Sequence, residues 1–154
     1  MTSTFNLIKG QEAYSSELAF VLFKLDQEFF PTPWNQESWT NLFSDHNRFL
    51  VTISNSSGEV SGFCLFDLSV ADSFAHLLKI LVNPNRQQSG LGEKLLNTAL
   101  ENLLGRSIAK YFLEVELTNS AACKLYERCG FKKIHQKKDF YGQGRDALIM
   151  IREL

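Results

Sequence analysis

The stretch LLKILVNPNRQQSGLGEKLLNTALENLL, residues 77–104, predicts a β-strand, a turn and an α-helix in succession. Residues 77–82 are apolar except for one lysine, and Asn83-Pro84-Asn85 ends the strand because proline cannot donate to a β-ladder and asparagine favours turns. From Leu91 to Leu104, leucine and alanine recur at intervals of three and four residues, which forms one apolar helical face. Gly105 follows directly and is the expected C-terminal cap of this helix.

The turn before this helix is a candidate phosphate-binding site. A helix N-terminus presents unpaired N–H groups and the positive end of the helix dipole, and Gly90 and Gly92 would let a bulky anion approach them closely. A P-loop is excluded, because Gly92 is followed by Glu93-Lys94 rather than by Lys and Ser or Thr. A dinucleotide fingerprint would need a third glycine where Leu95 stands. An ordinary glycine-containing helix start remains the alternative.

The composition predicts a single globular domain over residues 1–154. A chain of this length can bury a sizeable core, and 44% hydrophobic with 21% charged residues is typical of a soluble protein. The net charge of −1, without a basic run, predicts neither nucleic acid nor an anionic membrane as a partner. No signal peptide or membrane-spanning apolar run is found, so a cytoplasmic location is expected.

The cysteines and histidines predict neither disulfides nor a metal site. The cysteines are odd in number and lack a C-x-x-C pattern, as expected for reduced thiols in the cytosol; they are Cys64, Cys123 and Cys129. The histidines lie far apart and lack the spacing of metal ligands; they are His46, His76 and His135.

Runs of apolar residues predict a sheet covered by helices. The expected strands are residues 4–9, 49–54, 59–68, 77–82, 108–117, 131–138 and 147–152. The expected helices are residues from about 11 to 30, a short one capped by Asn35, residues 91–104, and one capped by Asn119 or Ser120 and closed by Gly130. The strand–helix–strand order makes residues 108–117 parallel to residues 77–82. The expected fold is an α/β sandwich around a mixed, mostly antiparallel sheet.

A carboxylate interrupts the apolar strand at residues 111–117. Burial of Glu114 would raise its pKa above the reference of about 4.3, which would make it a candidate general base. The alternative follows from spacing, because Glu114 and Glu116 have the same parity and could both occupy the solvent face of a half-buried strand. Spacing alone leaves both interpretations open.

Three further positions have a structural and a functional interpretation. Tyr126 could be a core residue or could protonate a leaving thiolate, since the pKa of a tyrosine is about 10 and that of a thiol about 8.5. Asn119 is first of all a helix cap. The segment Phe29–Trp34 contains two prolines and links two helices, so that Phe30 and Trp34 either close the core or form a wall of the substrate site.

These motifs together resemble those of the GCN5-related N-acetyltransferases. The hexapeptide Gln87-Gln88-Ser89-Gly90-Leu91-Gly92 has the pattern Gln/Arg-x-x-Gly-x-Gly/Ala and resembles the acetyl-coenzyme A loop of that family. Leu113-Glu114-Val115, Asn119–Ala122 and Leu125–Phe131, together with Pro33-Trp34, are similar to the ribosomal-protein-alanine N-acetyltransferase group. Residues 140–147 are similar to the loop with which protein N-terminal acetyltransferases hold a peptide backbone. The resemblance spans residues 33–150.

The resemblance implies a fold in which the central parallel strands are splayed around acetyl-CoA. It implies Glu114 as general base, Tyr126 as general acid, and Asn119 beside the cofactor or its base relay. It implies that the cofactor is held by Ile80, Leu81, Val82, Gln87, Gln88, Ser89, Gly90, Leu91, Gly92 and Glu93, and the acceptor by Phe30, Trp34 and Tyr141. Two residues depart from the pattern: Phe140 where tyrosine is common, and Lys79 where asparagine is frequent.

The expected activity is acetyl transfer from acetyl-CoA to the N-terminal α-amino group of a protein, for which the resemblance implies a ribosomal protein. The resemblance also implies direct attack by the amine, so the chain needs no nucleophile. An α-amino group with a pKa of about 7.7–8.0 loses its proton more readily than lysine at about 10.4, which favours N-termini. The alternatives are a small free amine or lysine as acceptor, or a non-catalytic coenzyme A-binding module. The chain is expected to be a monomer or weak dimer.

Overall fold

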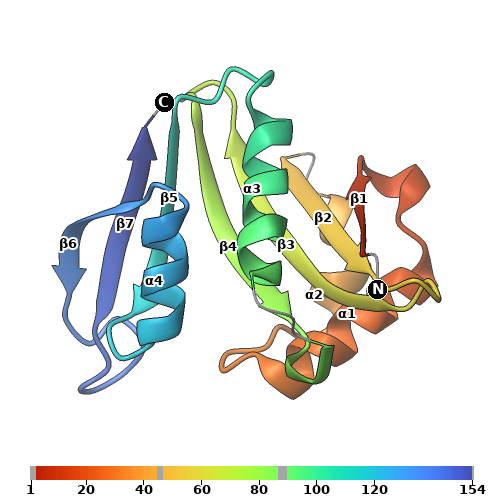
Figure 1. The fold of residues 1–154 in the computed structure, drawn as a ribbon, viewed down its shortest axis with the longest axis horizontal. Coiled ribbons are helices and arrows are strands. Elements are labelled where there is room, and N and C mark those ends of the chain that lie inside the picture. Colours follow the sequence, from red (N-terminus) through yellow and green to blue (C-terminus); the bar gives the residue numbers. More distant parts are fainter. Residues whose placement is uncertain (1–2, 45–46, 87–89, 154) are drawn as a thin grey trace.

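The computed structural model describes residues 3–44, 47–86 and 90–153, and within these ranges seven strands form one sheet (Figure 1). The strand order across the sheet is β1-β2-β3-β4-β5-β7-β6. Neighbouring strands are antiparallel except β4 and β5, which are parallel. The predicted mixed sheet with one parallel pair is therefore confirmed.

The strands are β1 (Thr4–Ile8), β2 (Arg48–Ser54), β3 (Val60–Ser69), β4 (Phe74–Val82), β5 (Lys110–Glu116), β6 (Lys132–Lys137) and β7 (Ala147–Glu153). The α-helices are α1 (Ser16–Phe29), α2 (Gln36–Thr40), α3 (Leu91–Leu103) and α4 (Ser120–Arg128). Short 3₁₀ turns occupy η1 (Gln11–Ala13), η2 (Leu42–Ser44) and η3 (Pro84–Arg86).

The predicted caps explain most helix ends. The side chains of Asn35 and Asn119 accept hydrogen bonds from Ser38 N and Ala122 N, which confirms both as N-caps. The first helix begins later than residue 11, because Ser15 caps it through Leu18 N. The prediction that Gly105 caps α3 is wrong. The C-cap is Leu104, whose backbone is right-handed, and the positive φ of 60° occurs later, at Ser107 rather than at Gly105.

Helices cover both faces of the sheet (Figure 1). Helices α3 and α4 pack on one face over the larger core, which includes Phe66, Leu95, Leu113 and Met150. Helices α1 and α2 pack on the opposite face over a second core, which includes Leu22, Trp39, Phe63 and Leu81. Strands β2, β3 and β4 supply side chains to both cores, as the alternation of a β-strand allows.

The two parallel strands pair over a short length only. Phe74–His76 of β4 pair with Lys110–Phe112 of β5. Beyond this point β4 continues to Val82, whereas β5 stays paired with β7 up to Glu116. The pairing of β4 with β5 ends at His76, and the two strands separate toward the start of α3 (Figure 1).

The thiols and histidines make no covalent or metal cross-link in the described part of the chain. Cys64, Cys123 and Cys129 are free thiols. Within residues 3–44, 47–86 and 90–153, which leave out His46, no three His, Cys, Asp or Glu side chains gather as metal ligands would. No α-helix of these ranges is long and apolar enough to cross a membrane.

Candidate functional site

A cleft of about 800 Å³ opens where β4 and β5 separate. Its wall is built from the end of β4, the start of α3, β5, α4 and two loops. The sequence-predicted residues that line it are Phe30, Ile80, Leu81, Val82, Gly90, Leu91, Gly92, Glu93, Glu114, Asn119, Tyr126 and Tyr141. Gln87, Gln88 and Ser89 were predicted for the same site and lie outside the described residues.

The cleft passes through the sheet from one face to the other. Glu114 and Glu116 alternate along β5 with Leu113 and Val115, which belong to the core beneath α3 and α4. The two carboxylates therefore project toward the face that carries α1 and α2. Phe30 and the residues after it line the cleft on that face, whereas α3 and α4 line it on the other.

The start of α3 presents backbone donors to the cleft. Gly90 is its N-cap, with φ 81° and ψ 4°, a left-handed conformation that glycine adopts without strain. Lys94 N donates to Gly90 O, so the N–H groups of Leu91, Gly92 and Glu93 precede the first intrahelical bond. All three residues line the cleft. This end of the cleft fits an anionic group such as a pyrophosphate.

Glu114 is paired with a histidine of the neighbouring strand. Glu114 Oε2 lies 2.6 Å from His76 Nε2, and the two side chains are 21% and 26% exposed. The imidazole of His76 stacks on Phe112, with ring centroids 4.2 Å apart. A carboxylate held beside an imidazole at the edge of water can take a proton from a bound amine and pass it on.

The structure agrees with parts of both interpretations of Glu114, as a candidate base and as a residue on the same strand face as Glu116. Glu114 and Glu116 do share one face of β5, but that face is the cleft rather than open solvent. His76 was not predicted as a site residue, because it contacts Glu114 only through the parallel register that sets His76 opposite Phe112. The only sequence signal was an isolated histidine directly before the predicted strand of residues 77–82.

Tyr126 belongs to the core and to the cleft. Its side chain is buried, packs edge-on against Phe131, and lines the cleft from α4. Burial raises the pKa of the Tyr126 hydroxyl above its ordinary value, and neighbouring thiols and Tyr141 act in the same direction. The hydroxyl therefore carries its proton at neutral pH, as a proton donor must, and the raised pKa makes it a weaker acid than an exposed tyrosine. Asn119, on the same wall, has its side-chain oxygen engaged in capping.

The loop between β6 and β7 closes the side of the cleft near Glu114. Arg145 donates two hydrogen bonds to Glu116, from Nη2 at 2.7 Å and Nε at 3.0 Å, which lowers the pKa of Glu116. Tyr141 lines the cleft beside them, and burial together with the carboxylates of Glu114 and Glu116 raises its pKa to about 12. Phe140 lies edge-on to Tyr141 and is 41% exposed.

The structure does not bring Trp34 to this cleft. Its indole packs against Trp39 with ring centroids 5.4 Å apart, lies under Arg48, and borders a separate depression near α2. Of the two interpretations of Phe29–Trp34, core closure describes Trp34, whereas Phe30 is a wall residue of the cleft.

Comparison with known proteins agrees with this geometry. The family model described as Acetyltransferase (GNAT) family matches residues 19–131. The [ribosomal protein bS18]-alanine N-acetyltransferase of Escherichia coli (strain K12) is 30% identical over 131 residues, which are 83% of this chain and 86% of that protein.

Two solved structures share the fold. The crystal structure of the ribosomal-protein-S18-alanine N-acetyltransferase from Escherichia coli superimposes with a TM-score of 0.83 at 23% identity, covering 99% of this chain and 94% of that one. That of Ard1 from Thermoplasma volcanium superimposes with a TM-score of 0.84 at 18% identity, covering 100% and 99%.

Proposed function

Because the chain belongs to the GNAT family of acetyltransferases, which use acetyl-CoA, we propose that it acetylates the N-terminal α-amino group of a protein. A relative that is 30% identical over most of both chains is named as an alanine N-acetyltransferase of ribosomal protein bS18, which supports a ribosomal protein beginning with alanine as the acceptor. The observation that carries the proposal is the cleft through the sheet, with the helix N-terminus on one face and Glu114 on the other.

The acetyl-CoA side of the site uses backbone groups. The N–H groups at the start of α3 that precede the first intrahelical bond hold the pyrophosphate; the predicted contributions of Gln87, Gln88 and Ser89 fall outside the described residues. The edge of β4 at Ile80 and Leu81 does not pair with β5, and we infer that its outward peptide groups contact the pantetheine arm and the thioester oxygen, with Val82 beside them.

The acceptor side uses the carboxylate and the tyrosine. Glu114, held by His76, takes a proton from the N-terminal ammonium of the acceptor, and the neutral amine attacks the thioester carbon. The C–N bond forms and the C–S bond breaks, and Tyr126 gives its proton to the departing thiolate. The nitrogen loses its second proton as the amide forms, and proton exchange with water returns Tyr126 and Glu114 to their starting states. Phe30 and Tyr141 border the groove through which the peptide enters.

We further propose that residues 1–154 are one domain that acts in the cytoplasm as a monomer or weak dimer. The strands of the described ranges form one continuous sheet, which supports a single domain. The three free cysteines are typical of a reducing compartment.

The test is thiol release from acetyl-CoA in the presence of several amines. The acceptors are short peptides that differ in their first residue, a polyamine, and peptides with a blocked N-terminus and a free lysine. Turnover confined to free N-termini, and highest with alanine, would support the proposal. Turnover of the polyamine alone would establish a small-amine acetyltransferase, and tight acetyl-CoA binding without turnover would indicate a binding module.

The role of Glu114 is tested with Glu114→Gln in the same assay. The substitution should lower kcat/KM by about 10²-fold or more, because the amide cannot accept the amine proton. Glu101→Gln is the matched control, since Glu101 is exposed on α3 away from the cleft, and its kcat/KM should equal that of the wild type. Unchanged activity in Glu114→Gln would exclude Glu114 as the base.

A further inference from the structure

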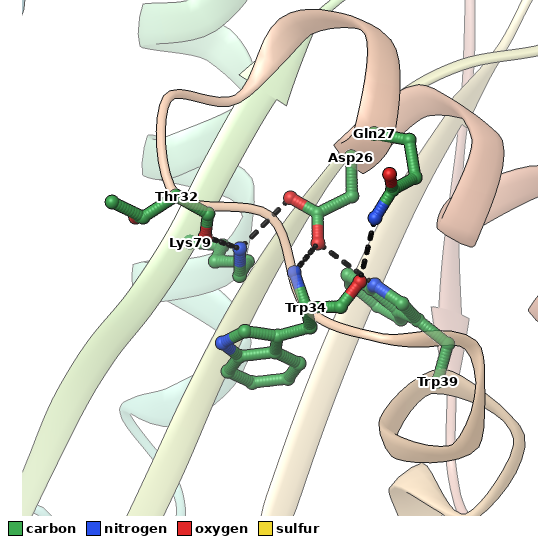
Figure 2. Close-up of polar contacts among 6 residues, drawn as sticks. All are labelled: Asp26, Gln27, Thr32, Trp34, Trp39 and Lys79. Atoms are coloured by element: carbon green, nitrogen blue, oxygen red, sulfur yellow. Dashed lines mark hydrogen bonds and ion pairs between the residues drawn. The ribbon is translucent and has the colours of Figure 1, made fainter.

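A buried ion pair joins β4 to the end of α1. Lys79 Nζ lies 2.8 Å from Asp26 Oδ1, and the two side chains are 2% and 0% exposed (Figure 2). Burying two charges is unfavourable unless further hydrogen bonds satisfy them. Neither residue lines the acetyl-transfer cleft, so the transfer chemistry itself does not explain the pair.

A β-bulge directs Lys79 toward Asp26. Lys79 pairs with Leu65 and Leu77 pairs with Phe66, so Leu78 is one extra residue in β4. Leu77 faces the core under α3, and regular alternation would place Lys79 on that same face. The extra residue reverses the alternation, and Lys79 instead reaches Asp26 on the face that carries α1.

Asp26 holds the segment that follows α1 through its second oxygen. Its Oδ2 accepts a hydrogen bond from the backbone N–H of Trp34 at 2.8 Å and another from Trp39 Nε1 at 2.9 Å (Figure 2). The next residue, Gln27, donates from Nε2 to Trp34 O at 3.0 Å. The C-terminal end of the segment Phe30–Trp34 is therefore fixed to α1.

Lys79 holds the middle of the same segment. Its ammonium donates to Thr32 O at 3.1 Å and lies 4.0 Å from the ring centroid of Phe30. A cation over an aromatic face is attracted to the ring, so the contact orients Phe30 as well as the backbone. The same ammonium lies 4.9 Å from the ring centroid of Trp34, so one group contacts Asp26, a backbone carbonyl and two aromatic faces at once.

The segment held in this way forms part of the cleft. Phe30, Pro31 and Thr32 line it on the face toward which Glu114 projects, which is the side of the acceptor. We propose that Lys79 and Asp26 are positioning residues that fix the Phe30–Thr32 wall and thereby set the affinity and selectivity for the acceptor. This inference rests on the proposed function, because it takes the amine to enter from that face.

The pair should therefore affect the binding of the acceptor and not that of acetyl-CoA. Loss of the pair displaces a wall that the acceptor touches, and misplacement of a positioning group by about 1 Å can cost up to about 10²-fold in rate. Acetyl-CoA binds through backbone groups at the start of α3 and at Ile80 and Leu81 of β4, whereas the Lys79 side chain is directed to the other face of the sheet, toward Asp26. The KM of the acceptor should rise while the affinity for acetyl-CoA stays constant.

The experiment compares Lys79→Met with Lys79→Gln. Methionine fills a similar volume without hydrogen-bond donors, whereas the glutamine amide offers two N–H donors for Asp26 and Thr32. Lys110→Met is the matched control, because Lys110 is a strand lysine whose ion pair with Glu153 is exposed at 3.9 Å. Each variant is assayed for peptide KM, kcat and acetyl-CoA Kd, below its melting temperature.

The expected result is a peptide KM raised about tenfold in Lys79→Met, partly restored in Lys79→Gln, with acetyl-CoA Kd within about twofold of the wild type. The differences in kcat/KM among peptides with different first residues should also become smaller. An unchanged peptide KM in folded Lys79→Met, or equal losses for peptide and acetyl-CoA, would overturn the inference. If Lys79→Met does not fold, the same criteria apply to Lys79→Gln.

An assay of the wild-type protein distinguishes a failure of this inference from a failure of the proposed function. A wild type that acetylates no N-terminal peptide refutes the proposed function. The same KM comparison is then made with whichever amine the wild type does acetylate, and it tests the positioning role independently.

Discussion

Replacement of Asp26 by asparagine tests the energetics of the buried pair most directly. The carboxylate accepts from Lys79 Nζ on Oδ1 and from Trp34 N and Trp39 Nε1 on Oδ2. An asparagine has one oxygen, so in either orientation its NH₂ group faces a donor. The ammonium of Lys79, which is 2% exposed, also loses its counter-charge.

Removal of one partner of a buried pair costs about 3–5 kcal/mol. For a chain of this size each kcal/mol lowers Tm by about 2–4 °C, so Asp26→Asn should melt about 6–20 °C below the wild type. Thermal and urea unfolding followed by circular dichroism measure the loss. Glu153→Gln, which removes one partner of the exposed pair with Lys110, should change the stability by no more than about 0.5 kcal/mol.

The loss should depend on pH with a definite sign. Burial lowers the pKa of Lys79, and the hydrogen bond and charge of Asp26 oppose that shift. In Asp26→Asn the opposing effect is gone, so the pKa of Lys79 in the folded variant falls further below its value in the unfolded chain. Between these two pKa values the unfolded chain binds more protons than the folded one, and the free energy of unfolding rises with pH. The difference in stability between variant and wild type should therefore shrink from pH 7 toward pH 10.

A double variant provides the internal control. In Asp26→Asn/Lys79→Met the amide oxygen can turn toward the two tryptophan donors, because no ammonium competes for it. The double variant should be more stable than Asp26→Asn alone. A loss below about 1 kcal/mol in Asp26→Asn, or a double variant less stable than the single one, would refute the reasoning.

Three further outcomes are expected. His76→Leu should lower kcat by about tenfold to 10²-fold while leaving acetyl-CoA Kd unchanged, because Glu114 loses its partner at 2.6 Å; an unchanged kcat would remove His76 from the mechanism. Tyr126→Phe should lower kcat by about 10²-fold without raising the peptide KM, as steady-state kinetics can show, and a raised KM alone would instead indicate a packing role. Gly62→Ala should destabilise the fold by about 1–3 kcal/mol in urea unfolding, because the added Cβ would lie 2.5 Å from Leu81 O; a neutral result would show that β3 and β4 can move apart.

The sequence predicted much of the cleft wall that α3 and β4 form. The apolar periods of residues 77–104 mark β4 and α3, and Gly90 stands at the helix start with the positive φ that favours glycine there. These features are local, because a strand, a turn and a helix cap depend on neighbouring residues. The same reasoning placed Glu114 within a strand of mixed polarity, where alternation puts it on one defined face.

The acceptor side depended on contacts between distant segments. His76 and Glu114 are 38 positions apart and meet only through the parallel register of β4 and β5. Trp34 was expected near the substrate with Phe30, but its backbone N–H is bound to Asp26, and the cleft is lined by Phe30, Pro31 and Thr32 and not by Trp34. Spacing along the chain contains no information about either contact.

The sequence by itself thus determined the elements, their order and the helix start that faces the cleft, because periodicity and capping act within a few residues. Only the tertiary structure decided where the charged side chains go. One extra residue in β4 reverses the direction of Lys79, and the pairing of β4 with β5 ends early enough to open a cleft. Both effects arise from strand register, which is set by packing between segments and not by the local sequence of either strand.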